Sequence, residues 1–475
     1  MAEFSDDIFF ASIMELNQKL KARAFSSVDL TRAFSRRLIQ LGPRYNALAI
    51  SLEETALKQA RDVDGDLKRD RFTGPLQGVP FGAKDLLSVA YKPTTWGARP
   101  YADQRFDFDA TVLKKLDRAG ATLVAKLAMV ELAGAGGYQS AAASLTGPGL
   151  NPWDITRWAG GSSSGSAAAV AAGLLPFAIG SETWGSILTP CAYCGVTGLR
   201  PTYGLVSRYG AMAVSWSLDK IGPIGRSAED CGRVLHAISG GDSSDPASAG
   251  KSFYYTPQFA RKLTDLRVGF APSDIAERAE PAARPAFQAA MEVIRATGVR
   301  MTEVELPDLP YAAVISTIIS AEGSAAFEPL IESGRVDQLA DQKQIAGLRA
   351  GLEIPAKDYL RAMRIRSIVR DELKKFFVNV DLLVSPSRFG VATRITEPLD
   401  QPSSASQPPK RRGLAGLGAA GNLAGLPALS IPCGFADGLP VGLQIVGRAF
   451  TENTLLALGV EYQSRTDWHR RRPKV

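Results

Sequence analysis

The chain has 475 residues, of which 45% are hydrophobic and 22% charged, a composition typical of globular proteins rather than of disordered, collagenous or coiled-coil chains. Its 55 basic and 48 acidic side chains give a net charge of +7, but the two signs alternate over most of the length, and only residues 469–474 form a basic cluster. The charge therefore gives no indication of a nucleic-acid partner.

Histidine and cysteine are scarce, with two and four residues. They form no cluster with the spacing of metal ligands, and so few cysteines argue against a disulfide scaffold and fit a reducing compartment. The acidic first residues lack the features of a signal peptide. The longest apolar stretch, residues 167–179, contains Gly173 and Pro176 and is too short to span a bilayer. The sequence predicts a cytoplasmic protein with no membrane span.

Residues 1–65 are predicted to be helical, because apolar side chains recur there near the 3.6-residue period of an α-helix: Ile8, Phe9, Ile13, Leu16 and Leu20. Ser26 and Ser27, just before Asp29, are typical of a helix start. From residue 74 onward, short apolar runs such as 78–83 and 121–125 alternate with helical stretches such as 110–119. This alternation predicts the α/β class, with a mixed or largely parallel sheet covered by helices on both faces.

The rest of the chain continues the same pattern. We predict an exposed loop at 240–256, strands at 266–270, 300–304 and after Asp381, and helices at 285–296 and over most of 310–377. The segment 397–413 is rich in proline and serine and predicts a mobile loop, which could serve as an active-site lid.

The segment from Gly160 to Gly195 reads GGSSSGSAAAVAAGLLPFAIGSETWGSILTPCAYCG. It predicts a glycine-serine loop, a helix over 166–173, a strand over 175–179 and a tight turn that opens another helix near Ile187. Ser186 would then lie at a helix N-terminus, where free N–H groups and the helix dipole favour the oxyanion of an acyl-transfer reaction.

Several kinds of site could use this segment. A phosphate-binding loop is excluded, because GGSSSGSA has no lysine. Cys191 and Cys194 form a CxxC pair, which is either a redox motif or two packed thiols on a helix. Ser163 formally fits a serine-hydrolase elbow, although the residues around Arg157 are a poor preceding strand. The elbow also needs a histidine, and the two that are present, His236 and His469, lie in plain surroundings.

A serine can instead be activated by a lysine that burial holds neutral. Lys84 is the candidate, since it follows the apolar strand end GVPFGA. The local sequence alone favours the simpler alternative of a strand-terminal lysine that reaches solvent.

The chain resembles the amidase signature family in several motifs that occur in that family's order. They are GVPFGAKD around Lys84, GGSSSGSAAAVAAG from Gly160, GSETWGSI from Gly180 with CGVTGLRPTYGLVSRYG after it, DKIGPIGRSAEDC from Asp219, NLAGLPALSIPCGF from Asn422 and GLPVGLQIVGRAF from Gly438. The resemblance implies one large domain over 1–475 around a twisted mixed sheet. Its parts would be a helical segment over 1–65, a signature core over 74–230, a variable region over 240–380 and the end of the core over 381–475.

The resemblance also implies a Ser–cis-Ser–Lys triad without metal or organic cofactor. Lys84 matches the base, Ser162 the bridging serine in a cis peptide, and Ser186 the nucleophile. The backbone N–H groups of Thr183, Trp184, Gly185 and Ser186 would then form the oxyanion hole.

Two departures from the family's turn, which reads D-[ST]-G-G-S-I-R, matter for the substrate. Trp184 replaces a glycine and Leu188 replaces an arginine. We interpret both as changes in the substrate pocket that suit an apolar or aromatic substrate, although the Trp184 ring could instead pack into the core. Gly136 and Gly137, in the small-residue loop 133–137, are expected to border the same pocket.

The predicted function is hydrolysis of C–N bonds in hydrophobic or aryl amides, with esters and carbamates (urethanes) as further substrates, by a monomer or homodimer. The alternative is the glutaminase subunit of a tRNA-dependent amidotransferase, which would release ammonia from glutamine within a complex. A catalytically silent binding protein is a third hypothesis, which the intact triad disfavours.

Overall fold

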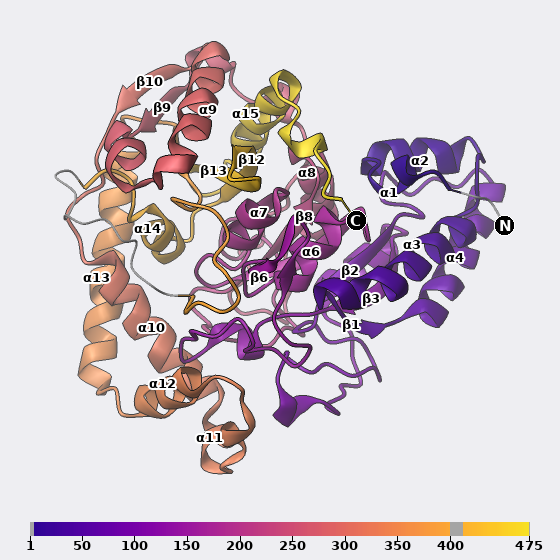
Figure 1. Ribbon diagram of the computed structural model, residues 1–475, viewed down its shortest axis with the longest axis horizontal. Coiled ribbons are helices and arrows are strands. Elements are labelled where there is room, and N and C mark those ends of the chain that lie inside the picture. The colour runs from indigo at the N-terminus through magenta and orange to yellow at the C-terminus, as the bar shows by residue number, and fades with distance from the viewer. Residues whose placement is uncertain (1–3, 400–411, 475) are drawn as a thin grey trace.

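A computed structural model of the protein describes residues 4–399 and 412–474. Within them, eleven strands form one mixed sheet (Figure 1). Its spatial order is β1 (Leu48–Ser51), β3 (Thr122–Leu127), β2 (Pro80–Lys84), β6 (Phe177–Glu182), β8 (Lys220–Gly225), β7 (Thr197–Arg200), β12 (Ala428–Ala436), β13 (Leu439–Gly447), β11 (Leu382–Pro386), β9 (Arg267–Phe270) and β10 (Arg300–Glu303). β2 runs parallel to β3 and β6, and β9 runs parallel to β10 and β11, whereas the other neighbouring strands are antiparallel. The α/β class and the mixed sheet are therefore confirmed.

Helices cover both faces of this sheet, so the central strands are buried throughout. Alternate side chains of a strand point to opposite faces, and on β8 Ile224 joins the core beneath α6 (Ser164–Ala171) and α7 (Leu188–Cys194). Ile221 joins the other core, beneath α8 (Ala228–Ile238). The helices α5 (Thr111–Arg118), α9 (Arg284–Ala296) and α15 (Glu452–Arg465) extend the α8 layer.

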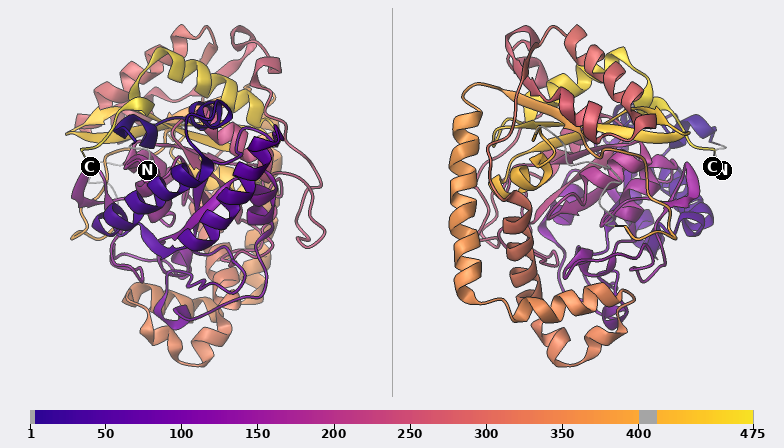
Figure 2. Two further views of the ribbon diagram at one scale, coloured as in Figure 1. Left: turned by 90° about the vertical axis from the view of Figure 1, so that its right-hand side faces the viewer. Right: turned by 60° about the vertical axis from the view of Figure 1, so that its left-hand side comes forward.

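A second group of helices packs beside the sheet, with the long helix α13 on the outside of the molecule (Figure 2). It comprises α10 (Tyr311–Ala326), α11 (Glu328–Glu332), α12 (Gln342–Leu352), α13 (Ala356–Phe376) and α14 (Leu417–Ala424). The prediction that 310–377 is mainly helical is thus confirmed.

The N-terminal segment is helical, as predicted, except for β1. Its helices are α1 (Asp6–Phe9), α2 (Ile13–Lys21), α3 (Ser27–Leu41) and α4 (Glu53–Lys68). The serine and aspartate signal marks the start of α3, where the Ser26 side chain accepts the Asp29 N–H in a capping box. Residues 48–51 are a strand because they pair with β3, a partner more than seventy residues away that no local periodicity reveals.

The loop 240–256 is irregular, as predicted, but it is not exposed throughout. Asp245 and Phe253 in it are only 6% and 7% exposed, because Asp245 is held by Arg208 and Phe253 packs into the core. The predicted lid over 397–413 lies mostly outside the described residues. In the part of the chain that the structure describes, no helix combines the length and apolar character needed to cross a membrane.

Candidate active site

Lys84 ends β2 inside the sheet and is 0% exposed. The expectation of a lysine that reaches solvent is therefore wrong, because β2 lies between β3 and β6 and helices cover it. Its Nζ donates to Ser162 Oγ at 2.7 Å and to Ser181 Oγ, on β6, at 2.9 Å. The lysine thus faces two hydroxyl groups rather than a carboxylate.

Burial lowers the pKa of Lys84 to about 7, and the carboxylates of Asp219 and Glu182 oppose that shift. A substantial fraction of this side chain is consequently neutral at physiological pH. Lys126 is also buried, but its Nζ forms an ion pair with Asp85 at 2.7 Å, which keeps a lysine charged. Of these two lysines, Lys84 is the one whose surroundings suit a general base.

The serine-rich loop brings Ser162 next to the turn that carries Ser186. The peptide bond between Gly161 and Ser162 is cis, which is the geometry that the resemblance implies. The next residue, Ser163, donates its backbone N–H to the Ser186 carbonyl at 3.3 Å. The loop and the turn are therefore tied together, and Lys84, Ser162 and Ser186 come from three separate segments to one place.

Ser163 is unsuited to the elbow mechanism, because its side chain is fully buried and its Oγ exchanges hydrogen bonds with the backbone of Ser181. The sequence indicated a poor strand before this loop, but a strand, β5 (Asp154–Trp158), does precede it. β5 pairs with β4 (Leu150–Asn151) and, through Arg157, forms a bridge with Arg394, outside the large sheet. His236 lies on α8 and accepts the N–H of Tyr255. Within the described chain, no hydrogen bond joins either histidine to Ser163.

The turn from Thr183 to Ser186 lines a cavity. Gly185 has φ of +88°, a conformation that favours glycine. Among the hydrogen bonds between described residues, none has an N–H of residues 183–186 as its donor. These four groups are therefore free to bind an oxyanion.

The helix that follows contributes less than predicted. α7 has seven residues and its N-cap is Ile187, so Ser186 lies just before the helix. The Glu182 carboxylate already accepts the N–H groups of Ile187 and Leu188, at 3.0 and 3.1 Å. Because this negative charge satisfies the helix end, the start of α7 is not available to bind a further anion.

Glu182 and Arg200 form a buried ion pair beneath the turn, at 2.8 Å and with both side chains 0% exposed. Asn422 Nδ2 donates to the same carboxylate at 3.1 Å. Burial raises the pKa of Glu182, but Arg200 and Lys220 lower it more strongly, to about 2. The carboxylate is therefore ionised and anchors the turn at neutral pH.

Sequence reasoning missed three polar residues of the site: Ser181, Glu182 and Asp219. Asp219 accepts a hydrogen bond from Thr183 Oγ1 at 2.6 Å. The only signal available was position, since Ser181 and Glu182 directly precede the turn and Asp219 opens one of the motifs.

A cavity of about 1030 Å³ opens at the turn. Gly136, Gly137, Trp184 and Leu188 all line it, as predicted for the substrate pocket, together with further apolar side chains: Tyr138, Trp158, Tyr193, Leu309, Tyr311, Ile319, Phe389 and Leu414. Trp184 is 43% exposed, so its ring is not packed into the core. Polar and apolar groups line the cavity in similar measure, and its charged residues are Glu182, Arg200, Arg278, Glu280 and Arg388.

Cys191 and Cys194 are buried, unbridged thiols on α7. Burial raises the pKa of both thiols, and a raised pKa makes a cysteine unreactive. The pair is thus packed thiols rather than a redox motif. Within residues 4–399 and 412–474, no group of three or more histidine, cysteine or carboxylate side chains is placed to hold a metal ion.

Comparisons with known proteins identify relatives of the whole chain. The family model described as Amidase matches residues 29–456. The chain is 37% identical to a glutamyl-tRNA(Gln) amidotransferase subunit of Chloroflexus aggregans, over 99% of each chain. Its structure is similar to the native peptide amidase of Stenotrophomonas maltophilia, with a TM-score of 0.83 and 32% identity over 98% of each chain. Its structure is also similar to one described as a vestigial protein complex that reveals the evolutionary origins of an s-triazine catabolic enzyme. The TM-score is 0.87, with 27% identity over 98% of this chain and 100% of the other.

Proposed function

The chain belongs to the amidase signature family of C–N hydrolases, and on that premise we propose that it hydrolyses hydrophobic or aryl amides, and related esters and carbamates, through an acyl-enzyme on Ser186. The observation that carries the proposal is the buried Lys84, whose Nζ lies 2.7 Å from Ser162 Oγ and whose pKa burial lowers to about 7. A neutral lysine in this position is a base that can activate a serine.

In the proposed mechanism, Ser186 Oγ attacks the carbonyl carbon of the substrate. Its proton passes to Ser162 Oγ, while the hydroxyl proton of Ser162 passes to neutral Lys84. The carbonyl oxygen becomes an oxyanion, which the free N–H groups of residues 183–186 stabilise. When the C–N bond breaks, the charged Lys84 returns a proton through Ser162 to the leaving amine. Water then attacks the acyl-enzyme by the same relay and releases the acid.

The choice of substrate class is supported by the walls of the cavity. Trp184 offers an aromatic face at the turn itself, and the apolar Leu188 follows the nucleophile by two residues. Aromatic and apolar side chains at this end of the cavity favour substrates that bury apolar surface there. A carbamate would form an alkoxycarbonyl-enzyme on the same serine, so the same residues serve amides, esters and urethanes.

The test is labelling with a fluorophosphonate, followed by intact mass and peptide mapping. We expect one adduct, on Ser186, which is lost in Ser186→Ala and kept in the matched control Ser163→Ala. An adduct on Ser163 would refute the proposed nucleophile. Rates on 4-nitroacetanilide, 4-nitrophenyl acetate and a 4-nitrophenyl carbamate then rank the substrate classes.

A second candidate function is that of the glutaminase subunit of a tRNA-dependent amidotransferase, because relatives named as glutamyl-tRNA(Gln) amidotransferase subunits match almost the whole chain. It would require release of ammonia from glutamine. Leu188 disfavours it, since it places an apolar side chain beside the nucleophile where the family pattern has an arginine. Glutaminase activity of the isolated chain that exceeds its anilide hydrolysis would favour this second function.

A further inference from the structure

The Asp219 carboxylate connects the oxyanion turn to a neighbouring loop. Its Oδ1 accepts the Thr183 hydroxyl at 2.6 Å, and its Oδ2 accepts the backbone N–H groups of Val214 and Ser215 at 2.8 and 2.9 Å. Burial raises the pKa of Asp219, and the hydrogen bonds from these three donors oppose that shift. Because all three partners are donors, they favour the ionised carboxylate. The side chain of the first oxyanion-turn residue is thereby fixed to residues 214–215.

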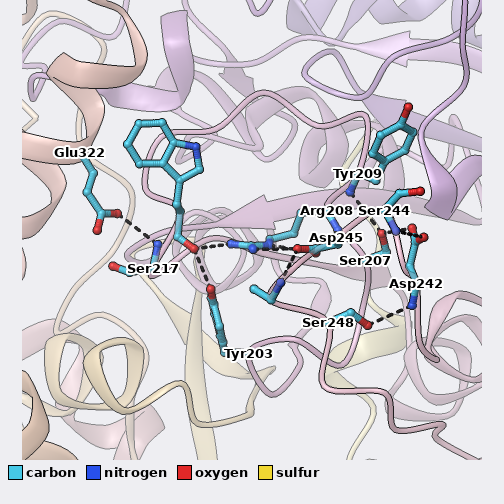
Figure 3. A network of polar contacts seen from close by, with 12 residues as sticks. Tyr203, Ser207, Arg208, Tyr209, Ser217, Asp242, Ser244, Asp245, Ser248 and Glu322 are labelled. Atoms are coloured by element: carbon cyan, nitrogen blue, oxygen red, sulfur yellow. Dashed lines mark hydrogen bonds and ion pairs between the residues drawn. The ribbon is translucent and has the colours of Figure 1, made fainter.

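That loop is itself held firmly on its outer side (Figure 3). The Trp216 carbonyl accepts Tyr203 Oη at 2.6 Å and an Arg208 nitrogen at 2.5 Å. Arg208 in turn pairs with the buried Asp245 at 3.0 Å. Residues 214–217 are therefore a rigid support rather than a free surface loop.

The same support is attached to the helices that stand beside the cavity. Ser217 donates its N–H to Glu322 on α10 at 3.1 Å (Figure 3). The Ser217 carbonyl accepts Arg366, on α13, at 2.6 Å. Asp219 thus connects the anchored residues 214–217 to Thr183, which lies 36 residues earlier in the sequence, and holds the Thr183 side chain in place.

Asp219 also supplies negative charge to the catalytic lysine. Asp219 and Glu182 are the carboxylates whose charge acts on Lys84. The charge of Glu182 is largely matched by its buried ion pair with Arg200, whereas burial holds the pKa of the neighbouring Lys220 well below its usual value. Removing the charge of Asp219 therefore leaves Lys84 with a weaker preference for its protonated form.

We propose that Asp219 is a positioning residue of the hydrolase, which holds the oxyanion turn in place through its hydrogen bond with Thr183. The inference rests on the proposed function of Ser186 and Lys84, and adds a residue that touches neither the substrate nor the reacting atoms. The hydrogen bond to Thr183 and the negative charge near Lys84 come from one carboxylate, and mutations can separate their effects.

The experiment measures the rate of fluorophosphonate labelling at Ser186 between pH 5 and pH 9 in three variants and the full wild-type chain. Asp219→Asn removes the charge and replaces one acceptor oxygen with an amide N–H₂ that faces donors. Thr183→Val removes only the hydroxyl and keeps the charge. Asp245→Asn loosens the outer anchor of the same loop and serves as the matched control for general destabilisation. Melting temperatures are recorded for all four proteins.

We expect labelling of Asp219→Asn to be slower by at least tenfold and its apparent pKa to fall by roughly one unit. Thr183→Val should be slowed without a shift in the pKa, and Asp245→Asn should lower the melting temperature while keeping the wild-type pH profile. The positioning role is refuted if Asp219→Asn, folded by its melting curve, matches the wild type in rate and pKa. A wild-type protein that is not labelled at Ser186 would instead overturn the proposed function, and the positioning role with it.

Discussion

The pH dependence of catalysis tests the central feature of the site, the lysine that burial keeps neutral. With the pKa of Lys84 at about 7, the neutral fraction of the base rises from about 1% at pH 5 to about 90% at pH 8. We therefore expect kcat/KM to increase roughly ninetyfold over this range, with a slope of about tenfold per unit below pH 6.5 and a plateau above pH 8. An ordinary lysine would instead give a continuous rise to about pH 10.

The assay follows release of 4-nitroaniline from 4-nitroacetanilide in a constant-ionic-strength buffer series, with circular dichroism at each pH to confirm the folded state. Lys84→Met keeps a side chain of similar length without the amine and should lower kcat/KM by about 10²–10⁴-fold at pH 8, with a smaller difference at pH 5, where the wild-type lysine is mostly protonated. A profile that keeps rising to pH 10 would show that Lys84 is not desolvated in solution. Undiminished activity of Lys84→Met would show that another group is the base.

The lowered pKa of Lys84 should also affect how the free energy of unfolding depends on pH. Its pKa is about 7 in the folded chain against 10.5 when unperturbed, so between these values the unfolded chain binds a proton that the folded chain does not. Stability rises with pH wherever the unfolded state binds more protons. The free energy of unfolding of the wild type, relative to that of Lys84→Met, should therefore increase from pH 7 to pH 10, as urea titrations at each pH would measure.

Three further variants probe other parts of the site. Burial raises the pKa of Glu131 from 4.5 to about 7, so its contribution to the free energy of unfolding should decrease as pH rises through this range, and Glu131→Gln should flatten that part of the curve in thermal melts. Glu182→Gln leaves Arg200 buried without its counter-charge and should cost about 3–5 kcal/mol in urea unfolding, whereas a loss below about 1 kcal/mol would contradict the anchoring role. Trp184→Gly should reduce kcat/KM for aryl amides about tenfold relative to kcat/KM for acetamide. Because the ring is 43% exposed, the melting temperature should stay nearly unchanged. An equal loss for both substrates would mean that the ring does not contact the aryl group.

Local sequence patterns were sufficient to predict the helices and strands whose apolar residues follow a clear period or form a clear run. The helix predicted at 285–296 is α9, and the buried strand predicted after Asp381 is β11. They failed at β1 and β5, two short strands in segments without a clear alternation. Each exists because of a partner: β1 pairs with β3, and β5 pairs with β4 in a bulged two-stranded sheet. Pairing energy comes from the neighbouring strand, which a single window of sequence does not contain.

The sequence by itself determined the family and the chemical identities that the site requires, because motif order, a lysine and two serines are properties of the chain as written. Only the tertiary structure decided which lysine is available as a base. Lys84, Lys126 and Lys220 are all buried, but Lys126 lies against Asp85, Lys220 donates to the Leu218 carbonyl, and Lys84 faces the hydroxyls of Ser162 and Ser181. The protonation state of a lysine depends on desolvation and on the charges around it, and both are set by residues that folding brings together from distant parts of the chain.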